Sequence, residues 1–249
     1  MSELDDRVVE WSHGPWSFLA VSPWERQVGD LVRRVARGEY PPSWRRNGSG
    51  RDFIVVAPVG GRSVVIRPYR RGGMARYILR ETYWGWHPRS FREFRCLLEL
   101  HRRQVPVVAP IGAAALWMGF GFYGAWLVTL YVDHSLTFWE WLQRRPAREE
   151  RAHVVDLLAQ ALARLHTAGA RHPDLNLRNV LVQRDPTGSV RVVLVDFDRV
   201  VLGKSPQSPR VALQRFWRSA RKLDPPATHW TALDQQKLLE AVERYWANA

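Results

Sequence analysis

The densest chemical signal in this chain of 249 residues is the stretch His172-Pro173-Asp174-Leu175-Asn176-Leu177-Arg178-Asn179-Val180-Leu181-Val182. Seventeen residues after Asn179, the motif Asp196-Phe197-Asp198 ends an apolar run that predicts a buried strand. Phosphoryl transfer needs a carboxylate that accepts the proton of a hydroxyl, and oxygen ligands that hold magnesium on the nucleotide phosphates. Asp174 and Asn179, five residues apart, offer that set together with Asp196. The alternative is that the first motif is only a polar turn and the second only a capped strand end. Their occurrence in one chain would then be an accident of composition.

Helical periodicity surrounds this loop in the second half of the chain. Apolar residues recur at helical spacing from Ala147 to Ala168, and Gly169 follows as a C-terminal cap. Thr137 and Glu140 form a capping-box pattern, which predicts a helix start. The other predicted elements are strands at 180–183 and 190–195, a turn at 185–188, and helices at 208–222 and 231–246.

The first half of the chain favours β structure around one main helix. Ser90 and Glu93 form a second capping-box pattern, at the start of an amphipathic helix. The other predicted elements are a loosely structured lead at 1–22, a helix at 24–37, a Gly-rich turn at 47–50, and strands at 53–57, 63–69, 107–117 and 125–132. The whole chain therefore predicts an α+β, bilobal architecture. We expect a lead and helix at 1–44, a small β-rich lobe at 45–132 and a short helical lobe at 133–249.

The motifs resemble those of the protein-kinase-like superfamily, in which His-x-Asp-Leu-x4-Asn and Asp-Phe-Gly occupy the same places. Three departures narrow the resemblance: Asn176 replaces a lysine, Asp198 replaces the glycine, and no lysine precedes Lys204. Arg67 follows the strand pattern where the phosphate-binding lysine is expected, and the resemblance implies Glu93 as its ion-pair partner. The alternatives are that Arg67 is a solvated strand arginine and that Glu93 only completes the capping box.

These departures look like those of the 3-deoxy-D-manno-octulosonic acid (Kdo) kinase branch of the lipopolysaccharide kinases, which carries Asp-Leu-Asn and Asp-Phe-Asp. That branch also has a Leu-Arg-x-Tyr-x-Arg-Gly-Gly run, similar to residues 66–73, followed by an Arg-x-Tyr motif and a helix, similar to residues 80–83 and 91–94. Leu127-Val128-Thr129 stands where the branch has Leu-Leu-Thr, although Leu130 stands where Glu is expected.

The resemblance covers residues 45–200 and implies an ATP-dependent phosphorylation of a Kdo hydroxyl on lipid A. By position, Asp174 is the base, and Asn179 and Asp196 hold Mg²⁺. Asp198 is a further candidate at the metal, as a ligand or as an acceptor beside one. Gly48 and Gly50 are candidates for the loop over the phosphates, or belong to an ordinary turn. The remaining alternatives are a kinase of the aminoglycoside or choline kinase type, and a non-catalytic module of this fold that binds anionic lipid.

The charge balance points to an anionic partner. Lys+Arg 37 against Asp+Glu 24 leaves a net charge of +13, and residues 53–80 contain six arginines and no acidic residue. Arg70, Arg71, Arg76 and Arg80 in this stretch are candidate ligands for the glycolipid's phosphates and carboxylate. Trp84 and Trp86 follow directly, and arginines beside tryptophans suit an anionic membrane surface. The alternative is a solvated charged loop with core tryptophans. No nucleic-acid motif is present, so we expect no nucleic-acid partner.

Composition excludes several other classes of protein. A chain with 46% hydrophobic and 24% charged residues is typical of globular proteins, and the single cysteine, Cys96, cannot form an intramolecular disulfide. No apolar run approaches the roughly 18 residues of a spanning helix, and the acidic start lacks a signal-peptide pattern. We therefore expect a soluble, cytoplasmic protein, and the resemblance implies a peripheral position on the cytoplasmic face of the inner membrane.

Overall fold

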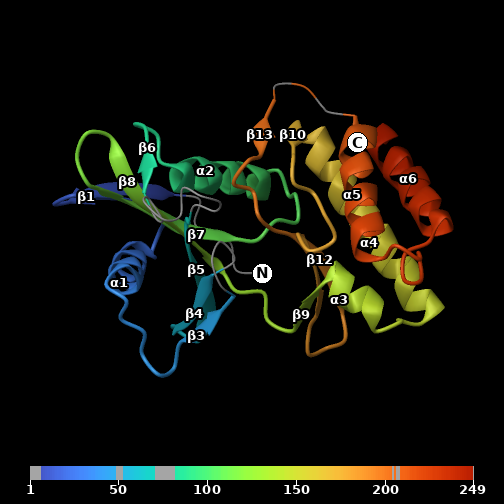
Figure 1. Cartoon of the computed structure of the whole chain (residues 1–249), viewed down its shortest axis with the longest axis horizontal. Coiled ribbons are helices and arrows are strands. Elements are labelled where there is room, and N and C mark those ends of the chain that lie inside the picture. Colours follow the sequence, from blue (N-terminus) through green and yellow to red (C-terminus); the bar gives the residue numbers. More distant parts are fainter. Residues whose placement is uncertain (1–6, 49–52, 71–81, 204, 206–207, 249) are drawn as a thin grey trace. The chain divides into compact units, whose positions relative to one another are not determined.

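The computed structural model describes residues 7–48, 53–70, 82–203, 205 and 208–248 (Figure 1). Its contacts group the chain into two compact units, which are described separately. Unit one comprises residues 1–98 and 109–131, and unit two comprises residues 99–108 and 132–249. Within the described ranges, no helix has both the length and the apolar character needed to cross a bilayer.

Unit one is built on an antiparallel sheet. Its strands follow the order β1-β2-β7-β8-β5-β4-β3, and β6 pairs with β8 outside that path. The strands are β1 (Val8–His13), β2 (Trp16–Val21), β3 (Arg45–Asn47), β4 (Ile54–Val59), β5 (Arg62–Pro68), β6 (Tyr83–Trp84), β7 (Pro110–Trp117) and β8 (Phe122–Leu130). The four strands predicted at 53–57, 63–69, 107–117 and 125–132 correspond to β4, β5, β7 and β8. Strand β4 pairs with β5, and β7 pairs with β8.

Helix α1 (Glu25–Ala36) covers one face of this sheet. Its buried residues recur at three- and four-residue spacing, as an amphipathic helix requires: Val28, Leu31, Val32 and Val35. The strand residues in the same core alternate in the sequence: Phe18 and Ala20, Val64 and Ile66, Trp126 and Val128. Gly112 permits the close approach, because a Cβ atom there would lie 2.7 Å from both the Val28 side chain and the Leu19 carbonyl oxygen.

Helix α2 (Arg89–Arg102) confirms the predicted helix but not its capping box. The helix begins one residue before Ser90, so Ser90 lies inside its first turn. The fully buried Ser90 hydroxyl donates a hydrogen bond to the carbonyl oxygen of Ala114 on β7, at 3.0 Å. The spacing of Ser90 and Glu93 therefore attaches the helix to the sheet, and Glu93 pairs with Arg67 on β5.

The predicted loosely structured lead at residues 1–22 is wrong for residues 8–21, which form strands β1 and β2. Strands β1 and β2 form a hairpin in which Trp11 lies opposite Phe18, and their rings stack at 4.9 Å. Strand β2 also pairs with β7, where Trp16 lies opposite Leu116. This pairing joins residues 100 positions apart in the sequence, so local periodicity carries little signal for it.

Unit two is mainly helical. Its helices are α3 (Phe138–Gln143), α4 (Arg148–Thr167), α5 (Pro209–Leu223) and α6 (Ala232–Ala247). One sheet has the order β12-β11-β9, and β10 pairs with β13. Their bounds are β9 (Ser135–Thr137), β10 (Ala170–Arg171), β11 (Val180–Arg184), β12 (Val190–Leu194) and β13 (Val201–Leu202). Phe138, Phe216 and Trp230 pack ring against ring in the core.

Local signals at the ends of two of these helices are confirmed. The amide of Glu140 donates to the Thr137 hydroxyl and the Glu140 carboxylate accepts from the Thr137 amide, which completes the predicted capping box of α3. Gly169 follows α4 with a φ of +74°, a conformation that favours glycine. A Cβ atom at this position would lie 2.6 Å from the carbonyl oxygen of Gly203, so the turn into β10 has no room for a side chain.

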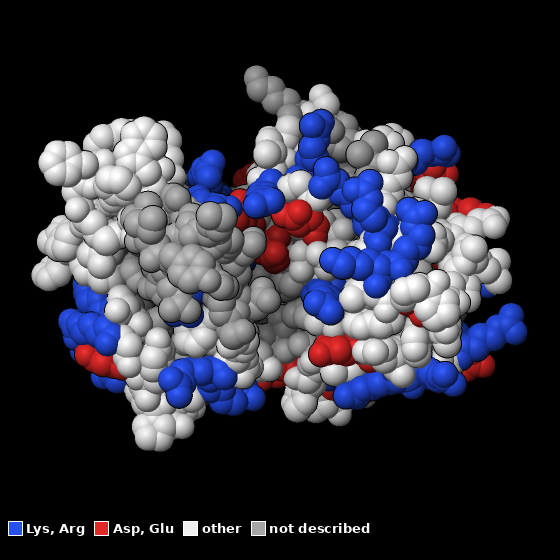
Figure 2. Space-filling model, viewed as in Figure 1, with Lys and Arg blue, Asp and Glu red and all other residues white. Residues whose placement is uncertain are grey.

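The basic excess is not confined to the arginine-rich stretch at 53–80. Figure 2 shows Lys and Arg side chains over both units on the face in view. On α5 the exposed basic residues are Arg210, Arg215, Arg218, Arg221 and Lys222. Unit two therefore contributes to the basic excess together with the stretch at 53–80.

Candidate active site

The loop at 172–179 folds around the backbone of Asp174. The side-chain amide of Asn176 donates to the carbonyl oxygen of Asp174 at 2.8 Å, and that of Asn179 donates to the same oxygen at 3.0 Å. The backbone amide of Asn179 also donates to the carbonyl oxygen of Asn176, at 3.1 Å. Because the side-chain nitrogen of Asn179 donates within the loop, its side-chain oxygen is the atom available to a ligand. The asparagines thus fix the loop, while the Asp174 side chain is exposed.

The hairpin of β11 and β12 brings Asp196 to this loop. Val180 at the start of β11 lies opposite Leu194 at the end of β12. One residue further, the amide of Val195 donates to the carbonyl oxygen of Asn179 at 3.0 Å. Asn179 and Asp196 therefore lie at the same end of the hairpin, although they are 17 residues apart in the sequence.

Asp196 has an unusual backbone conformation. Its φ is +66°, in the left-handed region that a residue with a side chain rarely adopts. Strain of this kind is typical of functional sites, where surrounding structure holds a side chain in a required direction. Asp198, the other carboxylate of this motif, is half-buried.

His172 and Phe197 connect the two motifs inside unit two. Their rings meet edge to face with centroids 5.0 Å apart, and both residues are buried. Burial lowers the pKa of His172 below its ordinary value, although Asp196 and Asp174 oppose that shift. His172 is therefore a neutral ring that packs the loop against the Asp196 motif.

Two arginines that the sequence did not single out contact the loop. The guanidinium of Arg199 lies 3.7 Å from the carboxylate of Asp174, and the side chain of Arg215 on α5 donates to the carbonyl oxygen of Pro173. Arg199 follows the Asp196 motif directly, so its place near the loop could have been proposed from the sequence. Arg215 had none, because it reaches the loop from 42 residues away.

Unit one carries a second cluster, at Arg67. Ile66 faces α1, so the next residue on β5 faces the opposite side of the sheet. There Arg67 forms the expected ion pair with Glu93 of α2, with the guanidinium nitrogen 2.5 Å from the carboxylate oxygen. The side chain of Glu93 is only 1% exposed and that of Arg67 is 23% exposed. The alternative reading of Arg67 as a solvated strand arginine is wrong.

Tyr69 completes this cluster and was missed in the sequence. Its hydroxyl donates to the same carboxylate oxygen of Glu93, and the Arg67 guanidinium lies over its ring at 5.0 Å. The signal was present, because residues two apart on a strand share a face. Two donors thus satisfy the buried carboxylate of Glu93, and the arginine is held in one orientation.

The structure describes only some of the other residues predicted to bind phosphate or the glycolipid. Gly48 follows β3 with a φ of +74°, and the Arg70 guanidinium stacks over the ring of Phe53 at 4.2 Å. Gly50, Arg71, Arg76 and Arg80 lie outside the described residues.

The donor set fits a magnesium ion that arrives with a nucleotide. Among the described residues, no group of three or more His, Cys, Asp or Glu side chains is gathered to hold a metal. Magnesium in phosphoryl-transfer sites is bound by one or two carboxylates and by substrate phosphates, so no preformed cage is required. Asp196 and Asn179 supply hard oxygen atoms at one end of the hairpin, which is the chemistry such an ion needs.

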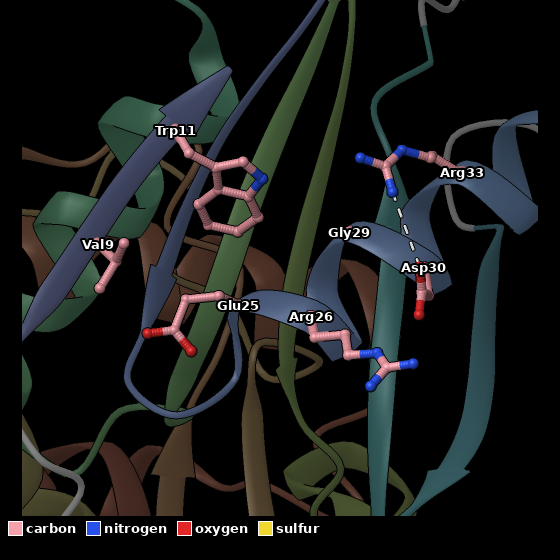
Figure 3. Close-up of a pocket in the computed structure, with 7 residues that line it drawn as sticks. All are labelled: Val9, Trp11, Glu25, Arg26, Gly29, Asp30 and Arg33. Carbon is pink, nitrogen blue, oxygen red and sulfur yellow. Dashed lines mark ion pairs between the residues drawn. The ribbon is translucent and has the colours of Figure 1, made fainter. Parts of the chain in front are cut away.

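A surface hollow of about 310 Å³ lies elsewhere in unit one, between β1 and α1 (Figure 3). Val9 and Trp11 project from β1 toward Glu25 and Arg26 of α1. None of the predicted site residues lines it. Its charges are balanced, since it is also lined by Asp30 and Arg33, which pair at 3.7 Å, so it favours no ligand charge.

Comparison with known proteins gives a family match over most of the chain. The model of the Lipopolysaccharide kinase (Kdo/WaaP) family matches residues 42–241. A 3-deoxy-D-manno-octulosonic acid kinase of Xanthomonas oryzae pv. oryzae is 39% identical over 178 residues, which are 70% of this chain and 63% of that protein. The enzyme of the same name from Pasteurella multocida is 31% identical over 210 residues, 82% of this chain and 80% of that protein.

Solved structures support the fold. WaaP in complex with acyl carrier protein is similar with a TM-score of 0.62 at 16% identity, over 91% of this chain and 88% of that one. A glucosamine kinase is similar with a TM-score of 0.50 at 14% identity, over 94% of this chain and 75% of that one. The expected α+β, protein-kinase-like fold is therefore confirmed.

Proposed function

Because the chain belongs to the lipopolysaccharide kinase (Kdo/WaaP) family, we propose that it phosphorylates a Kdo hydroxyl on lipid A with ATP. The observation that carries the proposal is the hydrogen-bonded set of unit two, in which Asn179 binds the backbone of Asp174 and Val195 binds the backbone of Asn179. This set holds a base candidate and two metal-ligand candidates in one place. The relatives named as Kdo kinases support Kdo as the acceptor.

Asp174 acts as the base in this proposal. Its exposed carboxylate accepts the proton of the acceptor hydroxyl while the hydroxyl oxygen forms its bond to the γ-phosphorus and the bond to ADP breaks. Arg199 places a positive charge 3.7 Å from this carboxylate, while Arg215 holds the preceding residue through the Pro173 carbonyl oxygen. The buried neutral ring of His172 fixes the start of the same loop.

Asn179 and Asp196 are the proposed ligands of Mg²⁺, with Asp198 as a further candidate beside them. When bound, the ion neutralises charge on the phosphates of ATP. The strained backbone of Asp196 supports this role, because it fixes the direction of the carboxylate before any ligand arrives.

Arg67 is the proposed phosphate-binding cation of unit one. Its planar guanidinium can bind two phosphate oxygens at once, whereas a lysine offers a single point charge. Glu93 and Tyr69 hold it in place. Gly48 and Gly50 remain candidates for the loop over the phosphates, and Arg70, Arg71, Arg76 and Arg80 for contacts with the anionic acceptor.

The proposed acceptor is a glycolipid, so the proposal includes a peripheral position on an anionic membrane, on the cytoplasmic face of the inner membrane. The net charge of +13 supports this, since each Lys or Arg near an anionic surface contributes about 1 kcal/mol of attraction. The arginine-rich stretch at 53–80 and the exposed basic face of α5 are the candidate contributors.

An acceptor panel tests the proposal. Purified protein is given ATP and magnesium with Kdo–lipid A, an aminoglycoside or choline, and phosphorylated product is detected by mass spectrometry. We expect product only from Kdo–lipid A, a rate lower by about 10²-fold or more with Asp174→Ala, and an unchanged rate with Glu149→Gln, which alters an exposed residue of α4. Product from an aminoglycoside or choline instead would assign the protein to that class of kinases. Absence of product on every acceptor would refute the proposal.

A further inference from the structure

An exposed apolar patch covers the end of the β7–β8 hairpin in unit one. It consists of Trp84, Trp86, Met118, Phe120 and Phe122, which we call the aromatic tip. Within the described part of the chain, these are five of the nine large hydrophobic residues with high exposure. Phe120 is 94% exposed and Trp86 is 74% exposed. Single exposed apolar residues are ordinary on protein surfaces, whereas a contiguous group of this size marks a binding surface.

The aromatic tip is held by strand pairing and by hydrogen bonds within the turn. Strand β6 pairs with the start of β8, so that Trp84 lies directly opposite Phe122. The turn closes with two backbone hydrogen bonds, from Met118 to the carbonyl oxygen of Phe122 at 2.8 Å and from Phe122 to that of Gly119 at 2.9 Å. Gly121 lies under both tryptophans, since a Cβ atom there would be 3.4 Å from the Trp84 ring and 3.8 Å from the Trp86 ring.

Two features of Phe120, at the apex of this turn, are energetically unfavourable. Its φ is +50°, in the left-handed region that disfavours bulky residues, and its ring is almost wholly in water. A glycine, asparagine or aspartate would fit this backbone with less strain and without an exposed apolar ring. The position therefore presents an aromatic side chain outward at the expense of stability, which indicates a function for the ring in a complex.

The charges around the tip select the partner. Residues 82–92 and 117–123 contain no acidic residue, and they include Arg89 and the exposed Arg92. Figure 2 shows no charged side chain over this end of unit one, at the upper left of the view where Figure 1 places the β7–β8 turn. Arg89 lies over the Tyr83 ring at 5.1 Å, so the exposed arginine here is Arg92. An uncharged aromatic apex followed by an exposed arginine matches an anionic bilayer, where Trp and Phe rings sit at the headgroup boundary and arginine contacts lipid phosphates.

We propose that the aromatic tip inserts into the interfacial region of an anionic bilayer and so brings unit one to the membrane that contains the acceptor. The inference rests on the proposed function, because a lipid-linked acceptor gives the enzyme a reason to bind the bilayer. Insertion buries the rings of Phe120 and Trp86, which are 94% and 74% exposed in water. Arg92, in the first turn of α2, stays at the surface beside lipid phosphates.

Vesicle sedimentation tests the proposal with the full-length protein and no substrate. The probe is a vesicle of phosphatidylethanolamine and phosphatidylglycerol, and the variants are Phe120→Ser and Trp86→Ser. Leu233→Ser is the matched control, because Leu233 is 58% exposed on α6 of unit two. We expect each tip variant to weaken partitioning by roughly tenfold or more, as loss of one buried aromatic ring predicts, and the control to bind like the wild type.

Two further measurements separate the possible outcomes. Sedimentation equilibrium without lipid reports association between copies of the chain. If the wild type dimerises, Phe120→Ser is monomeric and vesicles bind neither, the tip is a protein interface and the proposal is overturned. Partitioning that is equal for all variants also overturns it. Phosphorylation of deacylated, water-soluble acceptor reports the active site alone. We expect Phe120→Ser to retain the wild-type rate there. If no variant has activity while the difference in vesicle binding persists, the proposed reaction fails and the membrane contact stands.

Discussion

The buried ion pair of unit one should respond asymmetrically to removal of its two members. Arg67→Met leaves the carboxylate of Glu93 inside the protein, where its side chain is 1% exposed. Loss of one partner from a buried pair costs about 3–5 kcal/mol, because the other charge remains desolvated. The Tyr69 hydroxyl still donates to that carboxylate, so we expect the lower end of this range, about 3 kcal/mol.

Glu93→Gln should be much milder. The side chain of Arg67 is 23% exposed and can turn toward water, and the glutamine oxygen can still accept a hydrogen bond from Tyr69 or Arg67. We expect a loss of about 1 kcal/mol, comparable to one weakened hydrogen bond. The double variant should be less destabilised than the sum of the two losses, since removing both partners leaves no isolated charge.

Urea unfolding followed by far-ultraviolet circular dichroism measures all three variants at pH 7. Arg218→Met, a substitution at an exposed residue of α5, is the control and should leave the unfolding midpoint unchanged. Equal losses for the two single variants, or a larger loss for Glu93→Gln, would refute the electrostatic reasoning. Strict additivity in the double variant would show that the two side chains do not interact.

Three further outcomes follow from other parts of the structure. Gly112→Ala should cost about 1–3 kcal/mol, since its Cβ would meet Val28 and the Leu19 carbonyl oxygen at 2.7 Å, whereas Gly29→Ala on α1 should be neutral or stabilising; thermal unfolding compares the two. Burial lowers the pKa of His166 to about 4. Its unfolded pKa is about 6.5, so the unfolded chain binds the proton more tightly, and stability should fall by about 3 kcal/mol as pH drops from about 6.5 to 4. His166→Leu should flatten that profile, and an unchanged slope would contradict the assignment. Arg215→Met should lower kcat by about tenfold without a matching loss of stability, because it positions the Asp174 loop through the Pro173 carbonyl oxygen; equal kcat values would show that this contact is dispensable.

The second half of the fold could be predicted because its signals are local. Helical spacing, the Thr137 capping box and Gly169 each act within a few residues, so α3 and α4 can be predicted without knowledge of tertiary contacts. The β1–β2 hairpin lacked such a signal, since its position is fixed by pairing with β7 and by the stacking of Trp11 on Phe18. The spacing of Ser90 and Glu93 fits a capping box and a sheet attachment equally well, and the burial of both side chains decides between them.

The candidate site divides along the same line. Asp174, Asn179 and Asp196 could be proposed as site residues because they belong to two short motifs, which a two-stranded hairpin joins. Arg215, which contacts the loop from a distant helix, could not be proposed. Neither could the aromatic tip as a whole, because Phe120 and Phe122 join Trp84 and Trp86 only through the pairing of β6 with β8. Sequence periodicity reports which face a residue occupies, but not which distant residue shares it.

The rate of phosphate transfer by Asp174→Asn is the measurement that tests the central claim most directly. Kdo–lipid A is incubated with saturating magnesium and ATP, and nucleotide affinity is measured separately by calorimetry. Since the amide cannot accept the proton of the acceptor hydroxyl, kcat should fall by about 10²–10⁴-fold, while the Kd for ATP should be unchanged. A variant that transfers phosphate at the wild-type rate would show that Asp174 is not the base.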